Sequence, residues 1–204
     1  MNKHFTTIVF IFISVYHSVQ GNTIRQMNVK KLALSAITGI LLITGSSFQT
    51  HQSSEKEYQS KAAFLYHFVD YVEWKSDGDN DFFNIAILGE SDIAMPLMQI
   101  SDDKRIGTKK IRIKQYASVN DIEPSQIIFV SMNYNSSLDP LIAKFCYQPT
   151  LIITERNIDF IQGSHINFFI AENRLKFEVN LKSVSNSGLK ISSQLLQHAV
   201  VIKR

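Results

Sequence analysis

FFNIAILGESDIAMPLMQI, residues 82–100, contains the clearest indication of the fold class in this chain. Its first part, Phe82–Gly89, is a compact apolar run that ends in glycine, and this pattern predicts a strand buried on both faces. Ser91 or Asp92 can cap the short helix that follows and extends to Ile100. A doubly buried strand that leads into a helix is typical of α/β proteins, because helices there cover both faces of a parallel sheet.

Strands and helices alternate on both sides of this unit. Upstream, apolar residues recur at spacings of three and four through Lys56–Trp74, and we expect an amphipathic helix that ends near Trp74. Downstream, the expected elements are a half-exposed strand at Lys109–Tyr116, a buried strand at Gln126–Met132, a helix at Ser136–Phe145, a strand at Pro149–Glu155, a short helix at Asn157–Gly163, a strand pair that turns at Glu172–Asn173–Arg174, and final helices that cover the sheet. The pattern predicts one α/β domain, a three-layer sandwich with a mostly parallel central sheet of about six strands and an antiparallel hairpin at its C-terminal edge.

Two apolar stretches precede the domain, at Ile8–Tyr16 and Leu32–Gly45. Neither has the roughly 20 apolar residues that a membrane-spanning helix needs. The second stretch follows a methionine and two lysines and ends in small residues, which is the order of a secretory signal peptide. The pair fits either a hairpin anchor or a signal peptide with an unused upstream extension.

We expect residues 1–49 to be a leader, with translation beginning at Met27 and a signal peptide at about 27–49. Residues 50–204 would then be the exported domain. Mass spectrometry of the native mature protein tests this expectation, because a retained peptide from residues 1–26 would contradict it.

The distribution of charge argues against nucleic acid as a partner. The whole chain has a formal net charge of +3, but residues 1–49 contain four basic side chains and no acidic one. The remainder has 17 basic and 18 acidic side chains, a net charge of −1. Phosphate binding needs a concentrated positive face, and here the basic residues are dispersed.

No pattern in the chain is typical of a catalytic or metal site. No two of the six histidines stand at metal-ligand spacing, and His67, between apolar neighbours, is expected to be a partly buried helix residue. Gly89 is the only glycine of the three that a dinucleotide-binding turn requires. Ser192 and Ser193 lack the surroundings of a nucleophile and are expected to cap a helix. We therefore expect no enzymatic activity, no cofactor and no metal. The single cysteine, Cys146, cannot form an internal disulfide and is expected to be a small buried residue, with a reactive or intermolecular thiol as the alternative.

Aromatic side chains crowd the first helix of the predicted domain. One helical face cannot bury all of them, so some are expected to lie at a partner or dimer interface, and the alternative is that they wrap over the core at the edge of the sheet. The candidate interface residues are Phe64, Tyr66, Phe68, Tyr71 and Trp74.

The C-terminal block RLKFEVNLKSVSNSGLKISSQLLQHAVVI, Arg174–Ile202, joins an alternating strand, a polar helix, a glycine turn and a second apolar helix. In this order it resembles the C-terminal signature of the YfiR family (DUF4154-type) of periplasmic regulatory proteins. KAAFLYHFVDYVEW, IAILGES, QIIFVS and TLIITE resemble earlier segments of the family, so the resemblance extends from Glu57 to Lys203. Family members often have cysteines where this chain has Ala86 and Ser125, so redox control through disulfides is not expected here.

The resemblance implies a periplasmic, non-catalytic α/β protein that is often dimeric. The best-known members bind the periplasmic part of an inner-membrane diguanylate cyclase and restrain it, and an outer-membrane lipoprotein can sequester them. The expected partners are therefore an inner-membrane sensor protein or diguanylate cyclase, with an outer-membrane lipoprotein and a second copy of the chain as further candidates. The alternative function is a periplasmic small-molecule-binding module that serves a sensor kinase or transporter and uses the crevice near Gly89 and Asn133 at the carboxyl ends of the strands.

Overall fold

The computed structural model describes residues 54–74, 81–156 and 163–203. The expected leader, residues 1–49, and most of the short helix expected at Asn157–Gly163 lie outside these residues. Within the described part of the chain no helix is long and apolar enough to cross a membrane.

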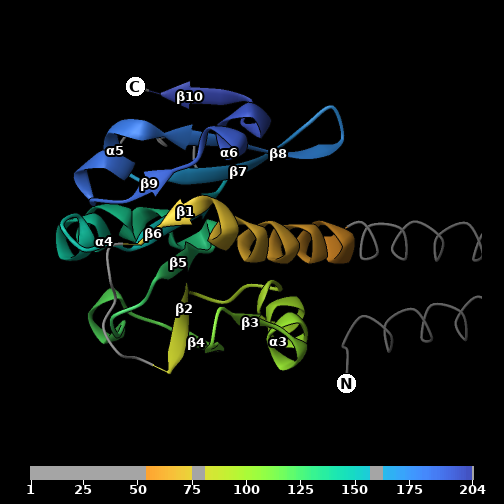
Figure 1. Cartoon of the computed structure of the whole chain (residues 1–204), viewed down its shortest axis with the longest axis vertical. Helices are drawn as coiled ribbons and strands as arrows, with labels where there is room; N and C mark the ends of the chain where they lie inside the picture. The colour runs from red at the N-terminus through yellow and green to blue at the C-terminus, as the bar shows by residue number, and fades with distance from the viewer. Residues whose placement is uncertain (1–53, 75–80, 157–162, 204) are drawn as a thin grey trace, which may run out of the picture. The chain divides into compact units, whose positions relative to one another are not determined.

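The fold is built on one large, mostly parallel sheet, as the sequence predicts (Figure 1). From edge to edge its strands are β10 (Val201–Lys203), β8 (Arg174–Asn180), β7 (Ile166–Ala171), β6 (Leu151–Glu155), β5 (Ile127–Val130), β2 (Phe82–Leu88), β4 (Lys109–Tyr116) and β3 (Arg105–Ile106). The pairs β7–β8 and β3–β4 are antiparallel, and all other neighbours are parallel. The described residues thus form eight strands in this sheet instead of about six, because a short strand is added at each edge.

The added strand β10 changes the expected position of the hairpin. Strands β7 and β8 pair from Ile166 opposite Val179 to Ala171 opposite Arg174, and the two residues between the strands, Glu172 and Asn173, have positive φ angles of 52° and 57°. This is the geometry of a two-residue type I′ turn. The hairpin is confirmed, but it is not the edge, because β10 lies parallel to β8 on its outer side.

Side chains of the central strands alternate between two apolar cores, one on each face of the sheet. In β2, Ile85 and Ile87 face the larger core, whereas Ala86 and Leu88 face the smaller one. The larger core is covered by the helix at 54–68, by α3 (Ala94–Asp103) and by the short helices α5 (Leu181–Asn186) and α6 (Ser193–His198). The smaller core is covered by α4 (Leu138–Phe145). The predicted three-layer arrangement follows from this alternation. Short 3₁₀ turns complete the connections at η2 (Val69–Tyr71), η3 (Val119–Asp121) and η4 (Met132–Ser137).

The first helix is shorter than its hydrophobic pattern predicts. Its described α-helical part covers residues 54–68 and passes through η2 into the strand β1 (Val72–Glu73). Strand β1 pairs antiparallel with β9 (Lys190–Ile191), and the N–H of Ser192 donates to the carbonyl of Tyr71 at 2.9 Å. The helix therefore ends early because its last turns are taken up by pairing with the C-terminal block. We call residues 54–74 the aromatic helix, including η2 and β1.

Candidate functional site: the aromatic helix and the carboxyl end of the sheet

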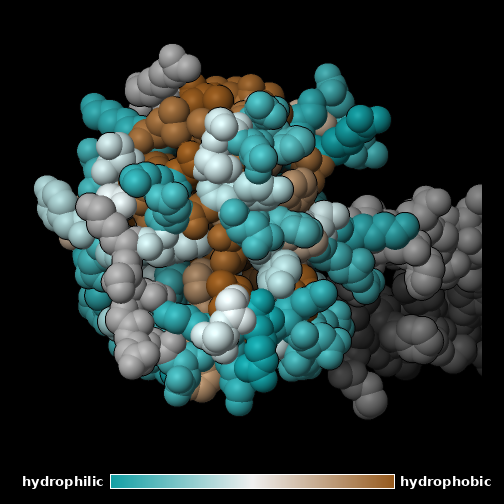
Figure 2. Space-filling view, in the orientation of Figure 1, coloured by the Kyte–Doolittle hydropathy of each residue, from teal (hydrophilic) through white to brown (hydrophobic). Residues whose placement is uncertain are grey.

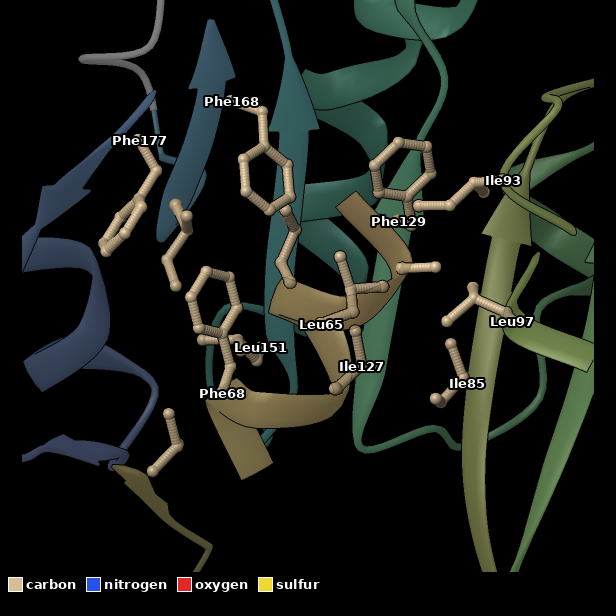
Figure 3. Packing of buried hydrophobic residues seen from close by; sticks show 14 of the residues in the cluster. Leu65, Phe68, Ile85, Ile93, Leu97, Ile127, Phe129, Leu151, Phe168 and Phe177 are labelled. Atoms are coloured by element: carbon tan, nitrogen blue, oxygen red, sulfur yellow. The ribbon is translucent and has the colours of Figure 1, made fainter. Parts of the chain in front are cut away.

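Two of the candidate aromatic residues belong to the core. Phe68 is completely buried and stacks on Phe168 at a centroid distance of 5.8 Å. Phe64 is half-buried and packs against Phe168 and Phe177 at 6.0 and 5.8 Å. Figure 3 shows the rings of Phe68, Phe168 and Phe177 together, between the aromatic helix and the strands β7 and β8. These contacts position the aromatic helix on the sheet.

Tyr71 and Trp74 are half-buried and also pack against the larger core. The Trp74 ring meets Phe83 edge-on at 5.3 Å, and its Nε1–H donates to the carbonyl of Gln126 at 3.1 Å. Four of the five candidate residues thus contribute to the core, which is the alternative that the sequence left open. Tyr71 and Trp74 keep part of their surface exposed, so they lie at the border between core and solvent.

Tyr66 is the candidate that does not pack against either core. It is half-buried, and its ring lies edge-on to the imidazole of His67 at 5.9 Å. His67 is exposed and is not the partly buried residue that its apolar neighbours led us to expect, because the helix turns it to the side away from Leu65 and Phe68. Tyr66 and His67 form the aromatic surface of this helix that a partner can reach.

A buried ion pair that was not predicted from the sequence anchors this helix. Lys61 is 1% exposed, and its ammonium group contacts the carboxylate of Glu155, which is 2% exposed, at the end of β6. The other carboxylate oxygen of Glu155 accepts the N–H of Met132 at 3.1 Å. A second acidic side chain, Glu57, reaches Lys61 at 2.7 Å. The charge of Lys61 is therefore compensated within the protein, as a buried charge must be.

Neighbouring charges determine the pKa values around this pair. Partial burial opposes ionisation of Glu57, but the hydrogen bonds and charges of Lys61 and Arg156 outweigh it and lower the pKa of that carboxyl group below its usual value. Burial and the negative charge of Glu155 raise the pKa of Tyr58, whose ring lies 4.4 Å from the ammonium nitrogen of Lys61. The cluster therefore favours the ionised form of Glu57 and the neutral form of Tyr58.

Helical spacing contains a signal for this pair. Tyr58, Lys61, Leu65, Phe68 and Val72 follow one another at intervals of three or four residues, so the lysine stands on the apolar stripe. A lysine on such a stripe requires an acidic partner from another element. The sequence could not say which acidic residue this is, because Glu155 is 94 residues away.

The backbone at the carboxyl end of β2 packs closely against neighbouring side chains. Gly89 follows this strand with a φ of 88°, and a Cβ placed there would overlap the ring of Tyr134 and the hydroxyl of Ser131. The side of the expected crevice that faces Gly89 is therefore occupied by the protein's own side chains. An open groove lined by described residues lies at the other end of the strands.

A histidine and a serine, His165 and Ser187, lie within hydrogen-bonding distance in the interior. The direction of their hydrogen bond indicates a structural role and not a catalytic one. Nδ1 of His165 accepts the N–H of Ile152 at 2.7 Å, and Nε2 lies 2.7 Å from Oγ of Ser187. Since Nδ1 accepts, the proton of the neutral ring is on Nε2 and is donated to Ser187. The imidazole therefore cannot remove the proton of that hydroxyl, which is within reach of the Ser183 carbonyl at 3.2 Å.

Two further expectations concern metal ligands and the cysteine. Among the described residues no three histidine, cysteine, aspartate or glutamate side chains form a cluster that could hold a metal ion. Cys146 is half-buried at the end of α4 and is less enclosed than the core residue that we expected.

A comparison with protein-family models shows to which family the chain is related. The model of the YfiR/HmsC-like family (DUF4154) matches residues 58–200, from the aromatic helix to the residue before β10. The chain belongs to the YfiR/HmsC-like family. The match covers nearly all of the sheet and both apolar cores of this YfiR/HmsC-like domain, and it includes Lys61 and Glu155.

Two solved structures with some likeness to this YfiR/HmsC-like chain share little sequence identity with it. One is an ABC domain from Streptococcus pneumonia in complex with L-Trp, with 13% identity and a TM-score of 0.43 over 59% of this chain and 56% of the other. Another is a conserved domain protein from Vibrio cholerae O1 biovar El Tor, with 11% identity and a TM-score of 0.46 over 72% and 60%. The chain thus spans less than two thirds of each of these structures. No curated protein sequence matches it.

The YfiR/HmsC-like domain also exposes apolar residues at the edge of the sheet. Val200, Val201 and Ile202 are 52%, 41% and 36% exposed. Figure 2 shows apolar surface at the end of the molecule where Figure 1 places β10. These three residues form another surface, besides Tyr66 and His67, that is suited to contact with another protein.

Proposed function

We propose that this protein is an exported, non-catalytic regulator that binds the periplasmic part of an inner-membrane signalling protein and restrains it, with a diguanylate cyclase as the partner. The observation that carries the proposal is the family match over residues 58–200, since regulation of this kind is the known role of YfiR proteins. The signal-peptide pattern in residues 27–49 supports export.

The architecture supports action by protein contact. The aromatic helix is held rigidly on the sheet by Phe68 and by the Lys61–Glu155 ion pair, so its outer side is a preorganised surface. Preorganised surfaces bind more tightly because less conformational entropy is lost on association. We propose that the outer side of this helix, with Tyr66 and the exposed parts of Tyr71 and Trp74, contacts the partner or a second copy of the chain.

Capture from membranes tests the proposal. The full chain with a C-terminal tag, purified from its own host after mild cross-linking, should recover an inner-membrane protein with a periplasmic sensor part. Deletion of the gene should raise cyclic-di-GMP and biofilm formation. Unchanged cyclic-di-GMP in the deletion strain would contradict the proposed restraint of a cyclase.

A matched pair of variants tests the proposed surface. Tyr66→Ala should weaken recovery of the partner and raise cyclic-di-GMP, because it removes the accessible ring of the aromatic helix. Tyr147→Ala is the control, since Tyr147 is 89% exposed directly after α4, the helix that covers the smaller core. Equal partner recovery with both variants would place the contact elsewhere.

A further inference from the structure

Positive charge is concentrated on one hairpin at the edge of the sheet. Residues 104–114 contain six of the 17 basic side chains of residues 50–204 and no acidic one. Five of the six lie in β3 and β4, which pair antiparallel. The basic residues are therefore less dispersed than we expected, and the net charge of −1 for residues 50–204 conceals this concentration.

Most of these charges lie on the same face of the sheet. Two isoleucines of β4, Ile111 and Ile113, pack against the larger core, so the residues that alternate with them lie on the side of the smaller core. Strand β3 follows the same alternation, because Arg105 is directly opposite Lys110. The side chains on this side are Arg105, Lys110, Arg112 and Lys114, and we call them the basic face.

The basic face lies beside the helix that covers this side of the sheet. Helix α4 packs on the smaller core, to which β2 contributes Ala86 and Leu88 from its carboxyl half. Phe82 and Asn84, from the amino half of β2 and on the same side, belong to neither core and pair with residues of the basic face. Because a helix is about 10 Å thick, the basic face forms a recess next to α4.

Three of the four charges have no counter-charge in the part of the chain that the structure describes. Lys114 is compensated, because its ammonium nitrogen lies 2.7 Å from both carboxylate oxygens of Glu123. Among the described residues, Arg105, Lys110 and Arg112 take part in no ion pair. Like charges directly opposite each other, as Arg105 and Lys110 are, destabilise a pair of strands. A local cost of this kind is commonly retained at functional sites.

Arg112 is already oriented for binding a carboxylate. Its guanidinium carbon lies 3.5 Å from the centre of the Phe82 ring, a cation–π contact that orders the side chain on the sheet. Among the described residues its N–H groups donate no hydrogen bond. A planar guanidinium group with free N–H donors can bind both oxygens of a carboxylate at once.

We propose that the basic face binds an acidic, extended segment of another protein. The cations of β4 recur at every second residue and are therefore about 7 Å apart along the strand. An extended segment with acidic side chains at alternate positions has the same repeat on one of its faces. A recess beside a helix admits such a narrow segment, whereas the flat surface of a bilayer is held off by α4. The inference rests on charge and spacing and does not depend on the proposed restraint of a cyclase.

Two labelled peptides of equal charge test the spacing. Fluorescein-labelled (Glu-Thr)6 should show a saturable rise in anisotropy when the purified full chain is added, and added NaCl should weaken binding because salt screens exposed charges. The peptide (Glu-Thr-Thr)6 has the same charge, but its successive acidic side chains lie on opposite faces of an extended chain. It should bind several times more weakly. Equal binding of the two peptides, or no binding of either, would overturn the proposal.

A matched pair of charge reversals tests the location. Lys110→Glu should weaken binding of (Glu-Thr)6 about tenfold, because it removes one exposed ion pair and adds a repulsion of similar size. Lys182→Glu is the control, since this exposed lysine lies on α5, which covers the larger core on the other side of the sheet. Circular dichroism checks that both variants retain the fold.

Two results with these variants would contradict the proposal. Equal affinity of the wild type and Lys110→Glu for (Glu-Thr)6 would place the contact elsewhere. Cosedimentation with phosphatidylglycerol vesicles distinguishes a membrane from a protein partner. If Lys110→Glu lowered vesicle binding and left peptide binding unchanged, the basic face would be a membrane contact, and the proposal would be overturned.

Discussion

Lys61 and Glu155 form a buried ion pair between the aromatic helix and the end of β6, across 94 residues of sequence. Each side chain is almost completely enclosed. The pair joins the first described helix to the centre of the sheet, at the end where Met132 and Arg156 also contribute contacts.

Removal of one partner of this pair should strongly destabilise the protein. Lys61→Met leaves the carboxylate of Glu155 buried with its main counter-charge gone, and the expected loss is about 3–5 kcal/mol in the free energy of unfolding. Urea denaturation measures it. Lys114→Met is the control, because its pair with Glu123 has side chains that are 43% and 57% exposed and is expected to contribute less than about 1 kcal/mol. Similar losses in both variants would show that the buried pair has no special role.

Acidification should destabilise the fold through His165. Burial lowers the pKa of this imidazole from 6.5 to about 4. Between these two pH values the unfolded chain binds a proton that the folded protein does not, so the free energy of unfolding falls as the pH decreases through this window and changes no further below it. The expected contribution is about 3 kcal/mol.

Urea denaturation at several pH values between about 7 and about 4 measures this slope. The control is His165→Gln, which retains an N–H donor for Ser187 and has no titrating group. Its stability should vary less in the same window. If wild type and variant had the same slope, groups other than His165 would be responsible.

Gly89 should tolerate alanine less well than Gly107. Both have positive φ angles, 88° and 58°, which cost an L-residue about 1–2 kcal/mol. At Gly89 the new methyl group would also overlap Tyr134 and Ser131, whereas at Gly107 nothing lies within 4 Å. We expect a loss of roughly 3 kcal/mol for Gly89→Ala and about 1 kcal/mol for Gly107→Ala, measured by thermal or urea unfolding. Equal losses would mean that Tyr134 moves aside freely.

Ser192 and Ser193 offer a matched pair for the C-terminal helix. The hydroxyl of Ser192 accepts the N–H of Leu195 at 3.3 Å and caps α6, whereas Ser193 is the exposed first residue of the helix. Ser192→Ala should cost about 1 kcal/mol and Ser193→Ala less than about 0.5 kcal/mol. A larger loss at Ser193 in chemical denaturation would contradict the assignment of the cap.

Local pattern was sufficient for many elements of the fold. The alternating residues of Lys109–Tyr116 predicted β4 with its observed bounds, and the apolar run at Phe82–Gly89 predicted β2. The turn between β7 and β8 and the cap at Ser192 were also predicted, because turns and caps depend on residues close together in the chain. The predicted end of the aromatic helix near Trp74 was wrong. The helix ends earlier because β1 pairs with β9, a segment that lies far away in the sequence.

Sequence alone is sufficient to predict the α/β class, the buried central strands and the family resemblance, since each rests on the type and order of neighbouring residues. The folded structure is needed to see that Lys61 meets Glu155, that Phe68 belongs to the core while Tyr66 packs against neither core, and that β10 completes the sheet. These outcomes depend on which faces of distant segments meet when the chain packs. Local periodicity specifies that a face is apolar, but it does not specify the face that covers it.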